Sequence, residues 1–336
     1  MKKDNSKSKK IILTGMRPTG MLHIGHYFGV MPEILQMQKT ADNLMVMIAD
    51  LHALTTLEDS KNIKEDSLAL AITYLASGID PEKSIIFVQS HVSEHAELAS
   101  ILGMVSPVPM LELCPVYKEK KEEHPKNNNL GLLAYPVLQA ADILIYKATD
   151  VPIGKDQSPH IEIAREIARK FNLRFGQIFP EPKTVLQKES KILSLQNPNK
   201  KMSKSHEEKS RIGLLDSSET IREKIKSAVT DSGSEIKYDV ENKPAISNLL
   251  TIYSLFSSKS ITVLEKEYAG KNYSIFKHDL AEVVIEGLSP IQKKYQELSA
   301  NPDYIKNILR AGAEKAKAIA SQTMAEVRSK IGFLEM

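Results

Sequence analysis

The amino-acid sequence predicts an α/β fold with a parallel sheet, followed by a largely helical C-terminal region. Apolar runs at residues 11–14, 44–49 and 84–88 have the short length that is typical of buried strands. Segments with the apolar spacing of helices lie between them, at residues 24–38 and 60–77. Strands that alternate with helices in this way favour a parallel sheet covered by helices.

The chain continues this pattern after residue 88 and becomes mainly helical in its last third. Residues 130–146 and 157–172 have helical spacing, and residues 192–195 form a short strand candidate within a polar loop. The charged and asparagine-rich segment 117–129 is interpreted as a solvated helix end and loop. Beyond residue 205 helical patterns dominate, at residues 219–229, 245–256, 281–298 and 303–331.

These patterns divide the chain into four parts. The polar and basic residues 1–10 are predicted to be a disordered tail. Residues 11–205 are predicted to form the α/β domain and residues 206–300 a helical domain. Residues 301–336 are predicted to form a last helix that packs back on the first domain. The length of 336 residues agrees with about two domains.

Composition excludes several classes of protein. The single cysteine, Cys114, rules out an intramolecular disulfide and a Cys-x-x-Cys motif, which favours a reducing compartment such as the cytoplasm. No run of 18 apolar residues is present, so no membrane span is expected. The net charge of +3 permits a nucleic-acid partner without demonstrating one. We predict no metal-binding residues.

The first candidate functional segment is His23-Ile24-Gly25-His26, which follows a strand and a turn and opens a helix. Ligands of open α/β sheets bind at the carboxyl ends of strands, and helix N-termini offer backbone donors to phosphate. Gly25 lets a ligand approach the backbone, and the two imidazoles share one helix face. We interpret the segment as a phosphate-binding turn. The alternative is two surface histidines beside a packing glycine.

The second candidate segment is Lys201-Met202-Ser203-Lys204-Ser205. Its lysines predict a mobile loop that meets the charge developing on a transferring phosphate. Such chemistry needs positioning and charge neutralisation more than a protein nucleophile. An exposed basic loop without this role is the alternative. The glycine-rich loop of P-loop nucleotide hydrolases is absent from the sequence, which argues against a kinase or GTPase.

Together and in this order, the two segments resemble the two signatures of class I aminoacyl-tRNA synthetases. Further segments resemble the tryptophanyl-tRNA synthetase family of bacterial type, and the resemblance extends from residue 11 to about residue 330. These segments are residues 15–20 (GMRPTG), 49–55 (ADLHALT), 135–144 (YPVLQAADIL), 151–157 (VPIGKDQ), 228–232 (AVTDS) and 243–250 (KPAISNLL).

One of these segments, residues 135–144, is predicted to be helical and has polar side chains spaced to bind tryptophan. Tyr135, Gln139 and Asp142 stand at positions i, i+4 and i+7, so they project from one helix face. A carboxylate there could accept the indole N–H, the only polar group of a tryptophan side chain. The resemblance assigns this role to Asp142. Its apolar neighbours make an ordinary helix-surface acid the weaker interpretation.

The resemblance also implies an architecture and a reaction. It implies a Rossmann-like catalytic domain at residues 11–205, an anticodon-binding helical domain at residues 206–300, and a cytoplasmic homodimer. The implied reaction forms Trp-AMP and pyrophosphate from L-tryptophan and ATP with Mg²⁺, and then transfers tryptophan to the 3′ end of tRNA(Trp). Five cations of the helical domain are expected to meet tRNA phosphates: Lys209, Arg211, Arg222, Lys224 and Lys226.

The resemblance implies three sets of site residues. The catalytic residues would be His23, His26, Lys201 and Lys204. The ATP-binding residues would be Arg17, Pro18, Thr19, Gly25, His26, Gly154, Lys155, Asp156, Ile192, Lys201, Met202, Ser203, Lys204 and Ser205. The tryptophan-binding residues would be Leu13, Gly15, His52, Tyr135, Gln139, Asp142 and Gln157.

Two positions depart from the family's pattern. Gln139 stands where many bacterial members have Met, and Lys155 stands where Glu is usual. Gln139 keeps open a tyrosyl-tRNA synthetase, which uses a similar Gln and Asp pair, although the segments after residue 205 argue against it. The alternatives from other classes are a synthetase-like binding protein without catalysis and a nucleotidylyltransferase that shares the histidine motif.

Overall fold

The computed structural model describes residues 9–55, 61–123, 128–154, 157–186, 192–203 and 207–334, and these residues form two compact units. Unit 1 comprises Met1–Thr19, Glu33–Gln187 and Asn301–Met336. Unit 2 comprises Gly20–Pro32 and Lys188–Ala300. Most of the tail predicted at residues 1–10 lies outside the described residues.

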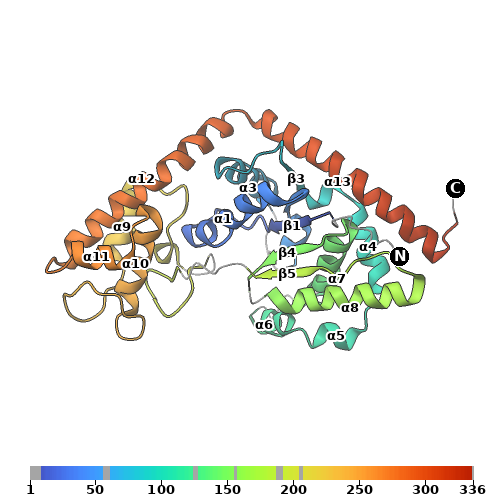
Figure 1. The fold of residues 1–336 in the computed structure, drawn as a ribbon, viewed down its shortest axis with the longest axis horizontal. Coiled ribbons are helices and arrows are strands. Elements are labelled where there is room, and N and C mark those ends of the chain that lie inside the picture. The colour runs from blue at the N-terminus through green and yellow to red at the C-terminus, as the bar shows by residue number, and fades with distance from the viewer. Residues whose placement is uncertain are drawn as a thin grey trace, which may run out of the picture. The chain divides into compact units, whose positions relative to one another are not determined.

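Unit 1 is built on a parallel sheet with the strand order β3-β2-β1-β4-β5 in the described part of the chain (Figure 1). The strands are β1 (Ile11–Met16), β2 (Asn43–Ile48), β3 (Ser84–Val88), β4 (Asp150–Ile153) and β5 (Lys183–Leu186). The chain runs from β1 to β2 and β3 on one side and returns to place β4 and β5 on the other. This reversal leaves a switch point between β1 and β4. The parallel sheet confirms the predicted α/β fold class.

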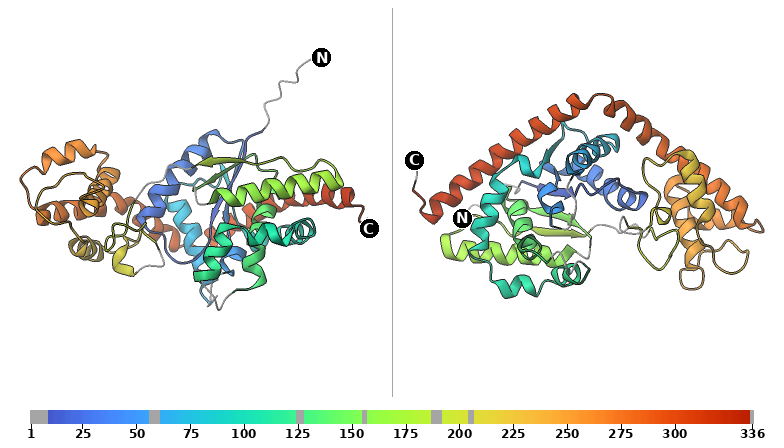
Figure 2. Two further views of the ribbon diagram at one scale, coloured as in Figure 1. Left: turned by 90° about the horizontal axis from the view of Figure 1, so that it is seen from below. Right: turned by 180° about the vertical axis from the view of Figure 1, so that it is seen from behind.

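Helices cover both faces of this sheet. Within unit 1 they are α2 (Asp50–Ala53), α3 (Ile63–Ala76), η1 (Gln89–His91), α4 (Glu94–Gly103), α5 (Val108–Glu112), α6 (Pro115–Glu123), α7 (Leu130–Ile145), α8 (Ser158–Phe175) and α13 (Pro302–Ile331). Helices α7 and α8 lie on one side of the sheet and α3 on the opposite side (Figures 1 and 2). Apolar side chains of β1, β2, α7, α8 and α13 share one buried core. Helix α1 (Ile24–Thr40) begins in unit 2 and ends in unit 1.

The last helix, α13, packs against β3, α3, α4 and α7 (Figure 2). Its approach to β3 depends on Gly312, where an added Cβ would lie 1.9 Å from the carbonyl oxygen of Ile86. Ser321 Oγ donates a hydrogen bond to Glu94 Oε1 at 2.6 Å, and Arg328 Nε donates to Glu97 Oε1 at 2.9 Å. Helix α13 therefore touches the sheet backbone and also fixes α4.

Unit 2 is helical, with η4 (Glu208–Ser210), α9 (Ser218–Ser227), α10 (Pro244–Ser257), α11 (Ile261–Glu267) and α12 (Tyr273–Ser299). Helix α12 packs against α9 and α10. The start of α1 and the residues just before it join this unit, because Ile24 N–H donates to Ile212 O (3.0 Å) and Leu214 N–H donates to Leu22 O (2.9 Å). The division of the chain thus differs from the boundary expected near residue 205. Among the described helices, none has the length and apolar character needed to cross a membrane.

We predict that Gly312→Ala destabilises unit 1 by about 1–3 kcal/mol, because the new methyl group meets backbone that cannot rotate away. Urea unfolding followed by circular dichroism measures the change. Gly103→Ala is the matched control, since a Cβ there meets no heavy atom within 4 Å. An unfolding midpoint for Gly312→Ala equal to that of Gly103→Ala would contradict the close approach of α13 to β3.

Candidate active site

A cavity lies in unit 1 near the carboxyl ends of β1 and β4, at the switch point of the sheet. Open α/β sheets bind ligands at this point. All the residues predicted to bind the amino acid except Gln157 line it: Leu13, Gly15, His52, Tyr135, Gln139 and Asp142. The cavity therefore gathers residues that are far apart in the sequence.

Local structure explains how two of these positions come to line the cavity. Asp142 lies on the same face of α7 as Tyr135 and Gln139, as the spacing predicts. Gly15 lies in β1, where a Cβ would sit 2.3 Å from the carbonyl oxygen of Met47 on β2. Any larger residue at position 15 would push the two strands apart.

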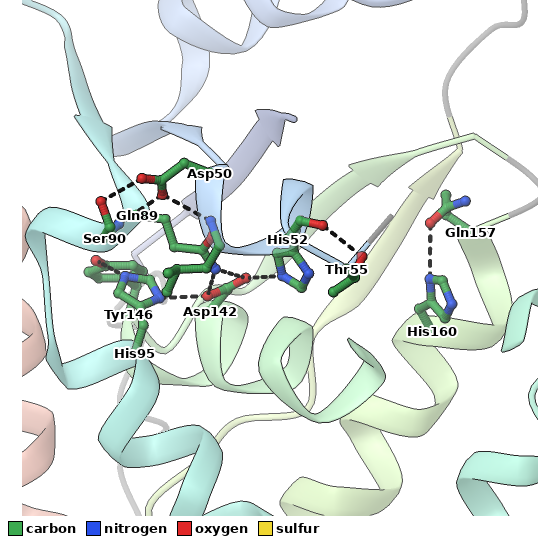
Figure 3. Close-up of polar contacts among 11 residues, drawn as sticks. Asp50, His52, Thr55, Gln89, Ser90, His95, Asp142, Tyr146, Gln157 and His160 are labelled. Atoms are coloured by element: carbon green, nitrogen blue, oxygen red, sulfur yellow. Dashed lines mark hydrogen bonds and ion pairs between the residues drawn. The ribbon is translucent and has the colours of Figure 1, made fainter. Parts of the chain in front are cut away.

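The carboxylate of Asp142 is almost fully buried and surrounded by hydrogen-bond donors (Figure 3). His52 Nε2 lies 2.7 Å from Oδ2, and His95 Nδ1 lies 2.6 Å from Oδ1. Gln89 Nε2 donates to both oxygens, at 2.8 and 3.0 Å. An ionised carboxylate only accepts hydrogen bonds, so both histidines present N–H groups to it.

Two further contacts orient the donors around Asp142. Leu51 N–H donates to Gln89 Oε1 at 3.2 Å, which turns the Gln89 amide nitrogen toward the carboxylate. His95 Nε2 lies 2.7 Å from the hydroxyl of Tyr146, which fixes the other side of that ring. Burial raises the pKa of the Tyr146 phenol, and the charges of Asp142 and Glu94 raise it further, so the hydroxyl keeps its proton.

These donors decide the charge of Asp142. Burial alone would raise the pKa of its carboxyl, but attraction to His52 and hydrogen bonds from His52 and His95 outweigh burial and lower the pKa to about 2. The cavity wall therefore carries a fixed negative charge at neutral pH.

Gln157 lies in a second cavity of unit 1 and not in the first. This cavity shares Arg17 and Tyr135 with the first. His160 Nδ1 lies 2.9 Å from Gln157 Oε1, and the His160 ring centroid is 5.3 Å from that of Tyr135. Gln157 is thus a neighbour of the amino-acid cavity through Tyr135.

The two motif segments meet within unit 2. The ring centroids of His23 and His26 are 3.8 Å apart, and the backbone of His23 pairs with Gly213. A Cβ on Gly25 would lie 2.9 Å from His23 Nδ1 and 3.6 Å from Met202 Cβ. Gly25 is therefore required by close packing, and it places the histidine segment against the lysine segment.

The lysine segment is held in a short antiparallel pairing. Ser194 N–H donates to Lys200 O at 2.8 Å, and Met202 N–H donates to Ile192 O at 3.1 Å. The strand candidate at residues 192–195 is wrong as a strand and appears only as the single bridge between Leu193 and Lys201. Met202 is buried, whereas Lys201 is exposed. This pairing leaves the Lys201 side chain directed away from the protein core.

Asn248 of α10 anchors this pairing. Its Oδ1 accepts a hydrogen bond from Leu193 N–H at 2.8 Å, and its Nδ2 donates to Leu193 O at 3.0 Å. The buried amide thus replaces a neighbouring strand on the open edge of Leu193. A helix of unit 2 therefore fixes the backbone from which Lys201 projects.

The remaining predicted ATP-binding residues are divided between the two units. Arg17, Pro18, Thr19 and Gly154 belong to unit 1, and Ile192 and Ser203 belong to unit 2. Lys155, Asp156, Lys204 and Ser205 lie outside the described residues.

Sequence reasoning missed Gln89, His95 and Tyr146. Gln89 directly follows β3, so the rule that ligands meet the carboxyl ends of parallel strands could have found it. Tyr146 follows Asp142 by four residues at the end of α7, a spacing that places both on one helix face and could have found it. His95 carries no such signal, because its contact with Asp142 depends on the packing of α4 against α7.

Comparisons with known proteins agree with this geometry. The chain matches the family described as tRNA synthetases class I (W and Y) over residues 5–289. It is 44% identical over 328 residues to the tryptophan–tRNA ligase of Caldanaerobacter subterraneus subsp. tengcongensis, covering 97% of this chain and 99% of that protein. It is also 44% identical over 325 residues to the tryptophan–tRNA ligase of Bacillus anthracis, covering 96% and 98%.

Solved structures give the same result. Tryptophanyl-tRNA synthetase from Campylobacter jejuni, complexed with ADP and tryptophan, has a TM-score of 0.85 at 38% identity, covering 96% of this chain and 100% of that chain. Tyrosyl-tRNA synthetase from Aeropyrum pernix shares only the fold, with a TM-score of 0.67 at 21% identity over 90% of each chain.

The fold and the two motif segments thus define a class I tRNA synthetase. Within that class, the chain belongs to the tryptophan–tRNA ligases. The tyrosyl and nucleotidylyltransferase alternatives are excluded by these matches.

We predict that Asn248→Asp lowers the rate of amino-acid activation about tenfold, because a buried carboxylate cannot donate to Leu193 O and leaves that carbonyl unpaired. ATP–pyrophosphate exchange measures the rate, and the KM for tryptophan should not change. Asn199→Asp is the control, since Asn199 is exposed on the turn that leads to Lys201. Equal exchange rates for the two variants would contradict the role of Asn248.

Proposed function

We propose that L-tryptophan binds in the unit 1 cavity and donates its indole N–H to Asp142. The enzyme activates L-tryptophan with ATP to give Trp-AMP and pyrophosphate, and then transfers tryptophan to the 3′ end of tRNA(Trp). The observation that carries the site assignment is a buried carboxylate that stays ionised on the wall of a cavity that is also lined by apolar residues such as Leu13, Met47 and Ile153.

This arrangement selects tryptophan by its one polar atom. Phenylalanine offers no donor to Asp142, and its binding would leave the buried carboxylate facing an apolar ring. Sites built around a hydrogen bond reject analogues that lack it by about 10⁴–10⁵ without an editing site. The apolar residues of the cavity wall then select for the shape of the indole ring.

Two side chains of α7 suit the ammonium end of the amino acid. Tyr135 and Gln139 line the cavity together with Asp142. Gln139 Oε1 is buried and has no hydrogen-bond partner among the described residues, so it is an acceptor available to a ligand. A Met at this position would offer only a weak acceptor. Gln157 lies beside Tyr135 and borders the same end of the site.

The activation step needs charge neutralisation at phosphate. A carboxylate oxygen of tryptophan attacks the α-phosphorus, and the bond from that phosphorus to the bridging oxygen of pyrophosphate breaks. The electron pair leaves with pyrophosphate, and no proton is transferred. Lys201 and Lys204 meet the charge of the leaving group, and His23 and His26 donate hydrogen bonds to phosphate oxygens. Mg²⁺ enters with ATP as part of the substrate.

The nucleotide contacts follow the residues implied by the family. Gly25 packs between His23 and Met202, and Ile192 is buried beside the lysine segment. The full proposed set is Arg17, Pro18, Thr19, Gly25, His26, Gly154, Lys155, Asp156, Ile192, Lys201, Met202, Ser203, Lys204 and Ser205.

Unit 2 is the proposed anticodon-binding part of the chain. The ion pairs of its cationic side chains restrict which of them can contact tRNA. Lys224 is buried and paired with Asp216 at 2.7 Å, so it serves the structure of the unit. Arg222 Nε donates to Glu282 Oε1 at 2.7 Å. Lys209 and Lys226 are exposed. These two lysines are the better candidates for tRNA phosphates.

The proposed homodimer has a candidate surface in unit 1. Met104, Val108 and Leu113 lie within ten residues of one another, at the end of α4 and on α5, and are 78%, 53% and 68% exposed. Clustered exposed apolar residues mark interaction surfaces. The free and buried thiol of Cys114 suits the reducing cytoplasm in which we place the enzyme.

We predict that Asp142→Ala lowers kcat/KM for tryptophan in pyrophosphate exchange by about 10²-fold or more, because the indole loses a charged acceptor. ATP binding, measured by calorimetry, should persist and serves as the control for folding. Tryptophan-dependent exchange within threefold of the unaltered enzyme would sink the assignment of Asp142.

We predict that Lys209→Ser combined with Lys226→Ser weakens aminoacylation at physiological salt while amino-acid activation is retained. The salt dependence of tRNA binding should also fall, by about 0.7–0.9 in log–log slope for each phosphate that is no longer neutralised. Lys39→Ser with Lys64→Ser makes the same charge change on exposed residues of unit 1. If both double variants aminoacylate equally, the anticodon-binding surface lies elsewhere.

A further inference from the structure

We infer that His95 is a positioning residue for tryptophan selection, which it serves by holding the Asp142 carboxylate in the direction that accepts the indole N–H. This inference rests on the proposed role of Asp142. His95 itself does not line the amino-acid cavity, whereas Asp142 and His52 do. It therefore acts through Asp142 and not on the substrate.

The donors of Asp142 differ between its two oxygens. Oδ2 contacts His52, which lies on the cavity wall, and accepts a hydrogen bond from Gln89 at 3.0 Å. Oδ1 contacts His95 at 2.6 Å and Gln89 at 2.8 Å, and neither of these residues lines the cavity. Both donors to Oδ1 therefore lie behind the cavity wall, whereas Oδ2 is the oxygen bonded to a residue of the wall.

The ring of His95 has little freedom to turn. It is fully buried, and its second nitrogen lies 2.7 Å from the Tyr146 hydroxyl. Tyr146 is also buried, and its ring packs edge-on against Phe87 with centroids 5.7 Å apart. A ring rotation would break both polar contacts at once, and an unpaired polar group in such a place is costly. Tyr146 thereby fixes which nitrogen of His95 faces Asp142.

The helix that carries His95 is also anchored. Its neighbour Glu94 accepts a hydrogen bond from Ser321 of α13, and Glu97 pairs with Arg328 of the same helix. These contacts hold the start of α4 against α13. The Tyr146–His95–Asp142 chain therefore rests on two helices, α4 and α7, whose relation is fixed.

Loss of the His95 hydrogen bond has a different effect from loss of packing. Without it, Oδ1 keeps only Gln89, and the carboxylate turns or takes up a proton. Either change weakens acceptance of the indole N–H, whereas the apolar wall still fits an indole-sized ring. The affected quantity is the preference for tryptophan over the isostere β-(benzothien-3-yl)alanine, in which sulfur replaces the N–H group.

The test measures dissociation constants of both amino acids by calorimetry on the full-length enzyme. We expect His95→Leu to reduce the preference for tryptophan about 10- to 100-fold, the effect of losing a hydrogen bond to a charged group. Tyr146→Phe should reduce the preference about 3- to 10-fold, because the His95 ring stays in place but loses its hydrogen bond to the Tyr146 hydroxyl. His95→Asn, which offers an N–H close to the position of Nδ1, should stay within about threefold of the unaltered enzyme.

Two reference variants make the outcome decisive. His91→Leu makes the same change at an exposed position four residues earlier and should leave the preference unchanged. Asp142→Ala should abolish the preference. If Asp142→Ala retains it, the proposed role of Asp142 fails and the inference fails with it.

If Asp142→Ala abolishes the preference while His95→Leu and Tyr146→Phe keep it, only the inference about His95 is overturned. An equal loss of affinity for both amino acids in His95→Leu and Tyr146→Phe would likewise overturn it, since that result describes packing alone. Should His95→Leu fail to fold, Tyr146→Phe and His95→Asn still decide the question.

Discussion

A negative charge removed from water must be compensated by donors, and the interior of unit 1 is organised to compensate Asp142. The donors come from three separate places: α2 after β2, the residue that follows β3, and α4. Removing one partner of a buried charge generally costs more stability than replacing the charge and its partners together by apolar residues, because the remaining charge stays unpaired. The sheet, α4 and α7 are therefore bound to one another by a single carboxylate as well as by apolar packing.

Unit 2 obeys a different constraint, which is the close approach of backbone segments. Gly25 has space for no side chain between His23 and Met202, and Leu193 pairs both with the lysine segment and with Asn248. Neither contact involves opposite charges. The two motif segments are far apart in sequence, and this backbone contact defines the geometry in which their imidazoles and ammonium group are presented.

The sequence predicted the strands that are continuous apolar runs and the helices with a clear apolar stripe, such as α7 and α13. It missed β4 and β5 because each has four residues, with Pro152 in one and Lys183 and Thr184 in the other. The amino-acid cavity could be predicted because the spacing of Tyr135, Gln139 and Asp142 fixes one helix face. His95 could not be predicted, because tertiary packing of α4 on α7 brings it to Asp142 and to Tyr146. The pairing of Lys224 with Asp216 could not be predicted, because only the folded unit brings the two side chains together.

Helix α13 is the last of the described helices and strands to leave the ribosome, yet it lies on β3 and holds α4 through Glu94 and Glu97. Strands β1, β2 and β3 emerge early. Strand β3 lacks the cover of α13 until that helix has been translated. Domains generally fold as units, and N-terminal domains fold first during synthesis. For this protein, completion of the first unit is postponed until α13 is made, so a chain that stops before this helix lacks a finished sheet surface and not merely a tail.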